Sequence, residues 1–133
     1  MRRIMMAAAF ALLAAPAARA QDDDPDGLKV FFDSGSAHVA ADQADTLDQA
    51  ARLFREGSPF VMILSGGADT VGLAESNLDL SVDRARAVAD ALVARGIPVD
   101  RLQVLGRGNS DLEVETGSGV ANAENRVVEI TWR

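Results

Sequence analysis

The sequence predicts a two-layer α/β (α+β) sandwich in which two helices pack on one face of a mixed four-stranded sheet. Three observations lead to this fold class. Two segments carry apolar residues at helical spacing, four segments have strand length and composition, and the order is strand, helix, strand, helix, strand, strand. No internal repeat is present, so we expect residues 28–133 to form one domain.

The residues before this domain have the pattern of an export signal and a linker. Residues 1–20, MRRIMMAAAFALLAAPAARA, have two arginines near the start, then an apolar run and an ending with small residues, as in a cleaved signal peptide. The apolar run is about a dozen residues long, whereas a membrane-spanning helix needs about 20. Residues 21–27, QDDDPDG, have the composition of a solvated acidic linker. We therefore expect a periplasmic protein with no integral membrane span.

The first half of the domain alternates strand and helix. LKVFF at 28–32 is rich in β-branched and aromatic residues, and the loop composition DSGS follows it. Apolar residues recur every three or four positions over 41–56, which predicts a helix that ends at the following glycine and proline. FVMILS at 60–65 is a continuous apolar run, typical of a strand that is covered on both faces.

The second half repeats the pattern and adds a strand. A helical pattern over 74–95 ends at Gly96 and Pro98, and RLQVLGRG at 101–108 predicts the third strand. The fourth strand is RVVEITWR at 126–133. Its alternation places one set of side chains on one face and a second set on the other, namely Val128, Ile130 and Trp132 against Val127, Glu129 and Thr131.

Charge and composition exclude several classes of partner and cofactor. Loss of the three arginines in 1–20 takes the formal net charge from −7 to −10, which argues against nucleic acid and anionic lipid. The sequence has no cysteine, so we expect no disulfide, thiol-bound zinc or lipid-modified cysteine. DDDPDGLKVFFD resembles a calcium loop, but Pro25 and Lys29 fall inside it and no helix flanks it. We expect no metal and no cofactor.

An enzymatic function is also not expected. The single histidine, His38, falls in a polar loop, and most carboxylates fall on exposed helix faces rather than in a shared cleft.

One acid and one base stand out in SGGADTVGLAESNLDLSVDRARAV at 65–88. Arg84 falls on the helix stripe that faces the sheet, whereas Arg86 points to solvent. A guanidinium withdrawn from water needs an anionic partner. Asp69 follows the second strand through two glycines and falls near the start of the helix, beyond the strand ends where open α/β sheets bind ligands. A simpler interpretation is that the two residues pair with each other, or that Asp69 caps a turn.

These segments resemble the OmpA-like domain of outer-membrane porin-like proteins, Pal and MotB. The resemblance covers about 30–132 and rests on FFDSGSA, GGADTVG, NLDLSVDRARAV, GIPVDRL, GRGNS and NRVVEI. It implies the fold deduced above and a non-catalytic task, the binding of the peptidoglycan peptide stem. In that family the motif aspartate meets the ammonium of diaminopimelate and the motif arginine meets its carboxylate. These positions fall on Asp69 and Arg84.

The same resemblance implies further site residues. Asn77 hydrogen-bonds ligand or loop, or else ties down backbone at the helix start; Asp33, Ala68, Thr70 and Arg126 are candidate supporting residues. Departures from the family pattern are Gly67 in place of His or Tyr, Ala68 in place of Thr, and Val127 in place of a second arginine.

The sequence therefore indicates two candidate functions. The first is a periplasmic module that binds peptidoglycan and links the envelope to the cell wall, with an outer-membrane or envelope protein as a candidate partner. The alternative is an OmpA-like scaffold for protein–protein contacts in the periplasm, whose wall-binding site is degenerate.

Overall fold

The computed structural model describes residues 27–57 and 61–133. The signal peptide expected over 1–20 and residues 21–26 of the expected linker lie outside the described residues, so both assignments stay predictions. No helix in the described ranges is long and apolar enough to cross a membrane.

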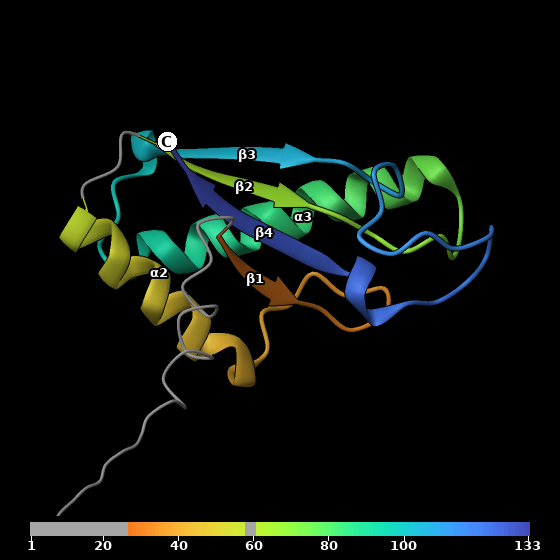
Figure 1. The fold of residues 1–133 in the computed structure, drawn as a ribbon, viewed down its shortest axis with the longest axis horizontal. Helices are drawn as coiled ribbons and strands as arrows, with labels where there is room; N and C mark the ends of the chain where they lie inside the picture. The colour runs from red at the N-terminus through yellow and green to blue at the C-terminus, as the bar shows by residue number, and fades with distance from the viewer. Residues whose placement is uncertain (1–26, 58–60) are drawn as a thin grey trace, which may run out of the picture.

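Four strands form one mixed sheet in the order β1-β4-β2-β3. β4 is antiparallel to both of its neighbours, and β2 and β3 are parallel to each other (Figure 1). Ile130 of β4 lies opposite Leu28 of β1 and Leu64 of β2. The mixed four-stranded sheet is therefore confirmed, with strands β1 (Leu28–Phe31), β2 (Met62–Gly66), β3 (Leu102–Gly106) and β4 (Val127–Trp132).

Two helices cover one face of this sheet (Figure 1). α3 (Ala74–Val93) packs against β2 and β3, and α2 (Ala44–Gly57) packs against β1 and α3. The helix predicted from residue 41 begins as the 3₁₀ turn η2 (Ala41–Gln43), a common start for an α-helix. Two more 3₁₀ turns, η3 (Val99–Arg101) and η4 (Ala123–Asn125), precede β3 and β4.

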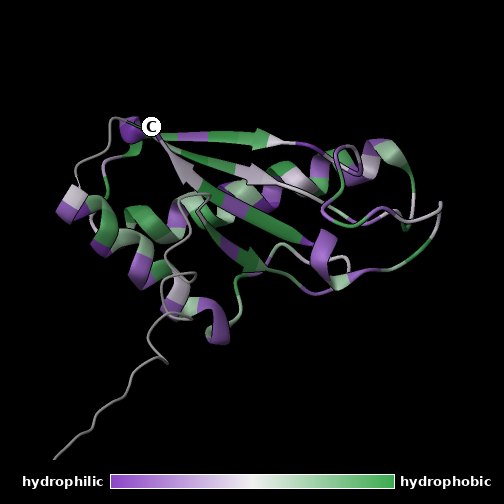
Figure 2. Cartoon of the chain, in the orientation of Figure 1, coloured by the Kyte–Doolittle hydropathy of each residue, from purple (hydrophilic) through white to green (hydrophobic). Residues whose placement is uncertain are grey.

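The core lies between the helices and the inner face of the sheet. Hydrophobic residues run along the strands, while α2 alternates between hydrophobic and hydrophilic residues (Figure 2). The fully buried apolar residues include Val30, Leu47, Met62, Leu64, Val88, Leu92, Val128 and Ile130.

One prediction about exposure needs correction. β2 alternates between buried and half-buried residues, with Ile63 and Ser65 half-buried, so this strand is not fully covered on both faces as predicted. The outer face of the sheet has no helix over it in the described part of the chain. Val127 points away from the Val128 side as predicted, yet it is also fully buried.

The topology brings chemically distinct residues to one edge of the sheet. β1, β2 and β3 run in the same direction and β4 runs against them. The carboxyl ends of the first three strands therefore meet the start of β4. Asp33, Asp69 and Arg107 follow these three strands, and Arg126 directly precedes β4.

Gly66 sets how closely α3 approaches this edge. A Cβ atom on Gly66 would lie 2.0 Å from the carbonyl oxygen of Ser81, so no side chain fits between β2 and α3 there. Arg84 is on the next turn of the same helix. The close packing of α3 on β2 therefore brings the Arg84 side chain next to the loops at the strand ends.

Candidate functional site

Arg84 is the largest fully buried side chain of the described residues, with 1% of its surface exposed. Its guanidinium donates to three backbone carbonyls, Nε to Ser36 at 2.8 Å, Nη1 to Gly67 at 2.9 Å and Nη2 to Asp33 at 3.0 Å. The expectation that a buried guanidinium needs an anion as its direct partner is wrong here, since neutral carbonyl oxygens serve instead. Arg84 thereby joins the loop after β1 to the loop after β2.

The charge of Arg84 has two further sources of stabilisation. The guanidinium carbon lies 5.4 Å from the centre of the Phe32 ring, within the range of a cation–π contact. Burial lowers the pKa of the Arg84 guanidinium, the nearby Asp69 carboxylate raises that pKa, and Arg126 lowers it. Asp69 therefore acts on Arg84 through space.

Asp69 is 5% exposed and accepts three hydrogen bonds. Oδ1 accepts from the Val71 amide at 3.3 Å, and Oδ2 accepts from the Asn122 amide at 3.2 Å. Oδ2 also pairs with Nη1 of Arg126 at 3.1 Å. The carboxylate thus caps its own turn and fixes the segment before β4.

The structure does not pair the acid and the base directly. Within residues 27–57 and 61–133 no ion pair joins Asp69 to Arg84, so the interpretation that they simply pair with each other is wrong. The other simple interpretation, a turn cap at Asp69, matches the bond from Val71. Asp69 therefore has two arginines near it, Arg126 in direct contact and Arg84 acting through space.

The other expected site residues mainly hold loops in place. Asn77 is buried and donates from Nδ2 to the Val71 carbonyl at 2.9 Å, which matches its role in tying down backbone. Ala68 is buried, and its amide donates to the Gly108 carbonyl at 2.8 Å. Thr70 Oγ1 donates to the Gly117 carbonyl at 2.6 Å. These contacts fasten the loop after β2 to α3 and to the segment after β3.

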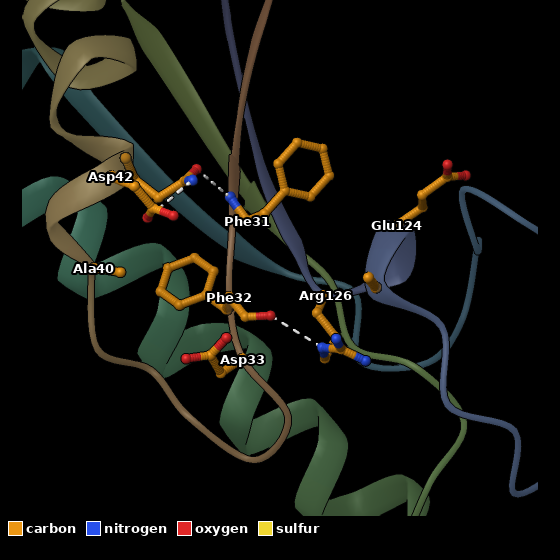
Figure 3. A pocket seen from close by; sticks show the side chains of 9 residues that line it. Phe31, Phe32, Asp33, Ala40, Asp42, Glu124 and Arg126 are labelled. Carbon is orange, nitrogen blue, oxygen red and sulfur yellow. Dashed lines mark hydrogen bonds between the residues drawn. The ribbon is translucent and has the colours of Figure 1, made fainter.

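Asp33 lies beside this cluster, on the wall of an open groove. Its carbonyl accepts from Arg84, while its carboxylate is exposed. The groove, of about 350 Å³, lies along the end of β1 between η2 and η4 (Figure 3). Arg126 forms part of its opposite wall and donates from Nε to the Phe32 carbonyl at 2.9 Å (Figure 3).

Arg107 is a residue near the site that the motifs did not indicate. A Cβ atom on Gly67 would lie 2.8 Å from Nη2 of Arg107, so the guanidinium lies over the backbone of Gly67. Arg107 Nη1 is 3.6 Å from a carboxylate oxygen of Glu113 and 3.8 Å from one of Glu129. The glycine at 67 therefore leaves space that Arg107 fills from the outer face of the sheet. Sequence analysis could have found Arg107, because it is the arginine of the GRGNS segment.

The described residues offer no metal centre of the usual kind. No group of three or more His, Asp or Glu side chains lies close enough to hold an ion in the described ranges. Because Asp69 and Arg84 are almost fully buried, a ligand that touches both must displace part of the surrounding loops.

A model described as OmpA family matches residues 31–126. The Peptidoglycan-associated lipoprotein of Rhizobium meliloti (strain 1021) is 37% identical over 82 residues, which cover 62% of this chain and 47% of that protein. The Probable lipoprotein YiaD of Escherichia coli (strain K12) is 33% identical over 102 residues, covering 77% of this chain and 47% of that protein. The chain thus spans about half the length of these curated relatives.

Solved structures agree on the fold. The crystal structure of the peptidoglycan-associated lipoprotein from Burkholderia pseudomallei superposes with a TM-score of 0.75 at 24% identity, covering 84% of this chain and 98% of that one. The C-terminal domain of Helicobacter pylori MotB gives a TM-score of 0.70 at 20% identity, covering 79% and 83%. At these identities the likeness establishes the architecture alone.

Proposed function

This chain belongs to the OmpA family, a non-enzymatic family, and on that basis we propose that it binds peptidoglycan. Support comes from the curated relatives named as peptidoglycan-associated lipoproteins and from a relative named Peptidoglycan-binding protein ArfA in Mycobacterium bovis, 31% identical over 104 residues. The proposal includes an exported, periplasmic location. It also includes association with the outer membrane through an outer-membrane or envelope protein partner.

The proposed ligand is the diaminopimelate of the peptide stem, bound by Asp69 and Arg84. The observation that carries this assignment is a buried acid and a buried base that act on each other electrostatically without forming an ion pair. Asp69 has four lone-pair positions and uses three, and Arg84 has five N–H donors and uses three. Each residue therefore retains capacity, one acceptor for an ammonium and two donors for a carboxylate.

The expected affinity for a single stem is modest. Each charge-assisted hydrogen bond contributes roughly 1.5–3 kcal/mol, and displacement of the loops offsets part of this gain. Micromolar to millimolar dissociation constants are the consequence, at about 1.4 kcal/mol per tenfold change. Attachment to the wall then depends on many stems in one polymer.

Sedimentation with insoluble sacculi tests wall binding, and the clamp variant is Asp69→Asn. This change removes the charge but keeps an oxygen that accepts from the Val71 amide. The matched control is Asp90→Asn, which makes the same chemical change at an exposed position of α3. We expect wild type and Asp90→Asn to pellet with sacculi, and Asp69→Asn to lose at least tenfold in apparent affinity. Pelleting of Asp69→Asn at the wild-type level would remove the clamp assignment and leave wall binding intact.

A specific observation also favours the second function, a protein-contact scaffold. Both clamp residues are nearly closed off by contacts within the chain, and Gly67 gives its space to Arg107. If wild type does not pellet with sacculi, this alternative gains support. In that case we expect this protein, used as bait in periplasmic extract, to retain a protein partner after the wall fragments have been digested.

A further inference from the structure

Asp69 is held in place without any direct contact to Arg84. One carboxylate oxygen is fixed by the Val71 amide at 3.3 Å. The other is fixed by the Asn122 amide at 3.2 Å and by Nη1 of Arg126 at 3.1 Å. Arg126 is the only one of these three donors that carries a charge, so it is the donor that competes with Arg84 for the carboxylate.

Arg126 is itself anchored at both ends. Its Nε donates to the Phe32 carbonyl at 2.9 Å (Figure 3). Its Nη1 pairs with Asp69 at 3.1 Å, and 17% of its side chain is exposed. Arg126 therefore connects the end of β1 to the loop after β2, as a short rigid strut. A planar guanidinium suits this task, because its donors point in fixed directions.

Without Arg126, the charges at the site favour direct pairing of Asp69 with Arg84. Asp69 already attracts Arg84 through space, and both are buried, where attraction between opposite charges is stronger than in water. A carboxylate released from Arg126 would turn toward the remaining guanidinium. Asp69 and Arg84 would then form a buried ion pair with each other, and a ligand would have to break that pair before it could bind both.

We propose that Arg126 is a positioning residue that holds Asp69 apart from Arg84, which keeps the acid and the base available to an ammonium and a carboxylate of one ligand. This inference rests on the proposed function for its consequence, but its structural part applies to the free protein. Arg126 also places a positive charge beside the ligand, and this charge favours the anionic peptide stem.

A competing mechanism makes the opposite prediction. If Arg126 instead occupies the place of the ligand's ammonium, the ligand must displace it. Removal of Arg126 would then strengthen binding, and the bond between Arg126 and Asp69 would be absent from the complex.

The test compares Arg126→Gln and Arg126→Lys with the exposed-site control Arg86→Gln, using meso-diaminopimelate as the probe in NMR titrations. Gln removes the charge, while Lys retains it. We expect at least tenfold weaker binding for Arg126→Gln, a smaller loss for Arg126→Lys and no change for Arg86→Gln. Equal or tighter binding by Arg126→Gln overturns the proposal. Melting temperatures of all variants show whether the fold is kept.

Two further measurements keep the inference separate from folding and from the proposed function. In wild type saturated with meso-diaminopimelate, the Arg126 side-chain NMR signals should remain those of a restrained guanidinium; a released side chain overturns the proposal even if Arg126→Gln does not fold. If wild type does not bind meso-diaminopimelate, the proposed ligand assignment fails. A crystal structure of ligand-free Arg126→Gln then decides the structural part: Asp69 paired with Arg84 supports it, and an unmoved Asp69 overturns it.

Discussion

Arg84→Lys tests how much the carbonyl network at the sheet edge contributes to the fold. The guanidinium reaches three carbonyls in different directions, on Ser36, Gly67 and Asp33. A lysine keeps the positive charge, but its ammonium is a single point on a flexible chain and cannot replace a planar fork. We expect it to keep one of the three hydrogen bonds.

The loss of two hydrogen bonds to a charged group corresponds to about 3–6 kcal/mol of unfolding free energy, at roughly 1.5–3 kcal/mol each. Domains of this size have a total stability of about 5–15 kcal/mol. With a urea slope of about 2 kcal/mol per M, the midpoint should fall by about 1.5–3 M. Trp132 is the single tryptophan and packs against the core, so its fluorescence reports unfolding.

The control is Arg86→Lys, two residues along the same helix at an exposed position. It makes the same chemical change without a buried network, and we expect a shift below about 0.5 kcal/mol. If Arg84→Lys is as stable as Arg86→Lys, the three carbonyl contacts contribute little, and the argument that Arg84 stitches the two loops together is wrong. Any loss of ligand binding in Arg84 variants must be corrected for this effect on folding.

Two more predictions concern the backbone around the site. Gly66→Ala should cost at least about 3 kcal/mol, because its Cβ would lie 2.0 Å from the Ser81 carbonyl oxygen, whereas Gly57→Ala, with no atom within 4 Å of the new Cβ, should change stability by less than about 1 kcal/mol in thermal denaturation. Thr70→Val should cost about 1–2 kcal/mol and speed amide exchange at Val120, whose amide donates to Thr70 Oγ1 at 3.0 Å.

The periodicity of apolar residues was sufficient to predict the order of strands and helices along the chain, but not the strand order β1-β4-β2-β3 within the sheet. Helical spacing and strand alternation depend on local burial, and the sheet and helices recovered that order. The predicted cover on both faces of β2 was wrong, because an apolar residue such as Ile63 on a half-open face is common in proteins. The pattern of one strand does not report what lies over each of its faces.

The hydrogen-bond partners of Asp69 and Arg84 could not be predicted from the sequence, for a physical reason. Asp69 and Arg126 are 57 positions apart, and their contact depends on β4 lying between β1 and β2. The acceptors of Arg84 are backbone carbonyls, whose directions depend on loop dihedral angles that side-chain identity does not specify. A charged residue on an inward stripe therefore predicts that compensation exists, but not which atoms provide it.

The compensation that the structure uses has a consequence for binding. Had Arg84 been neutralised by Asp69, a zwitterionic ligand would first have to break a buried ion pair, which typically costs several kcal/mol. Because carbonyls hold Arg84 and Arg126 holds Asp69, both charges are already fixed in position and apart. A ligand then has to move loops but not the charged groups themselves, and a pre-organised pair loses little conformational entropy on binding. If the proposed function holds, the same contacts that stabilise the edge of the sheet also favour recognition of a zwitterion there.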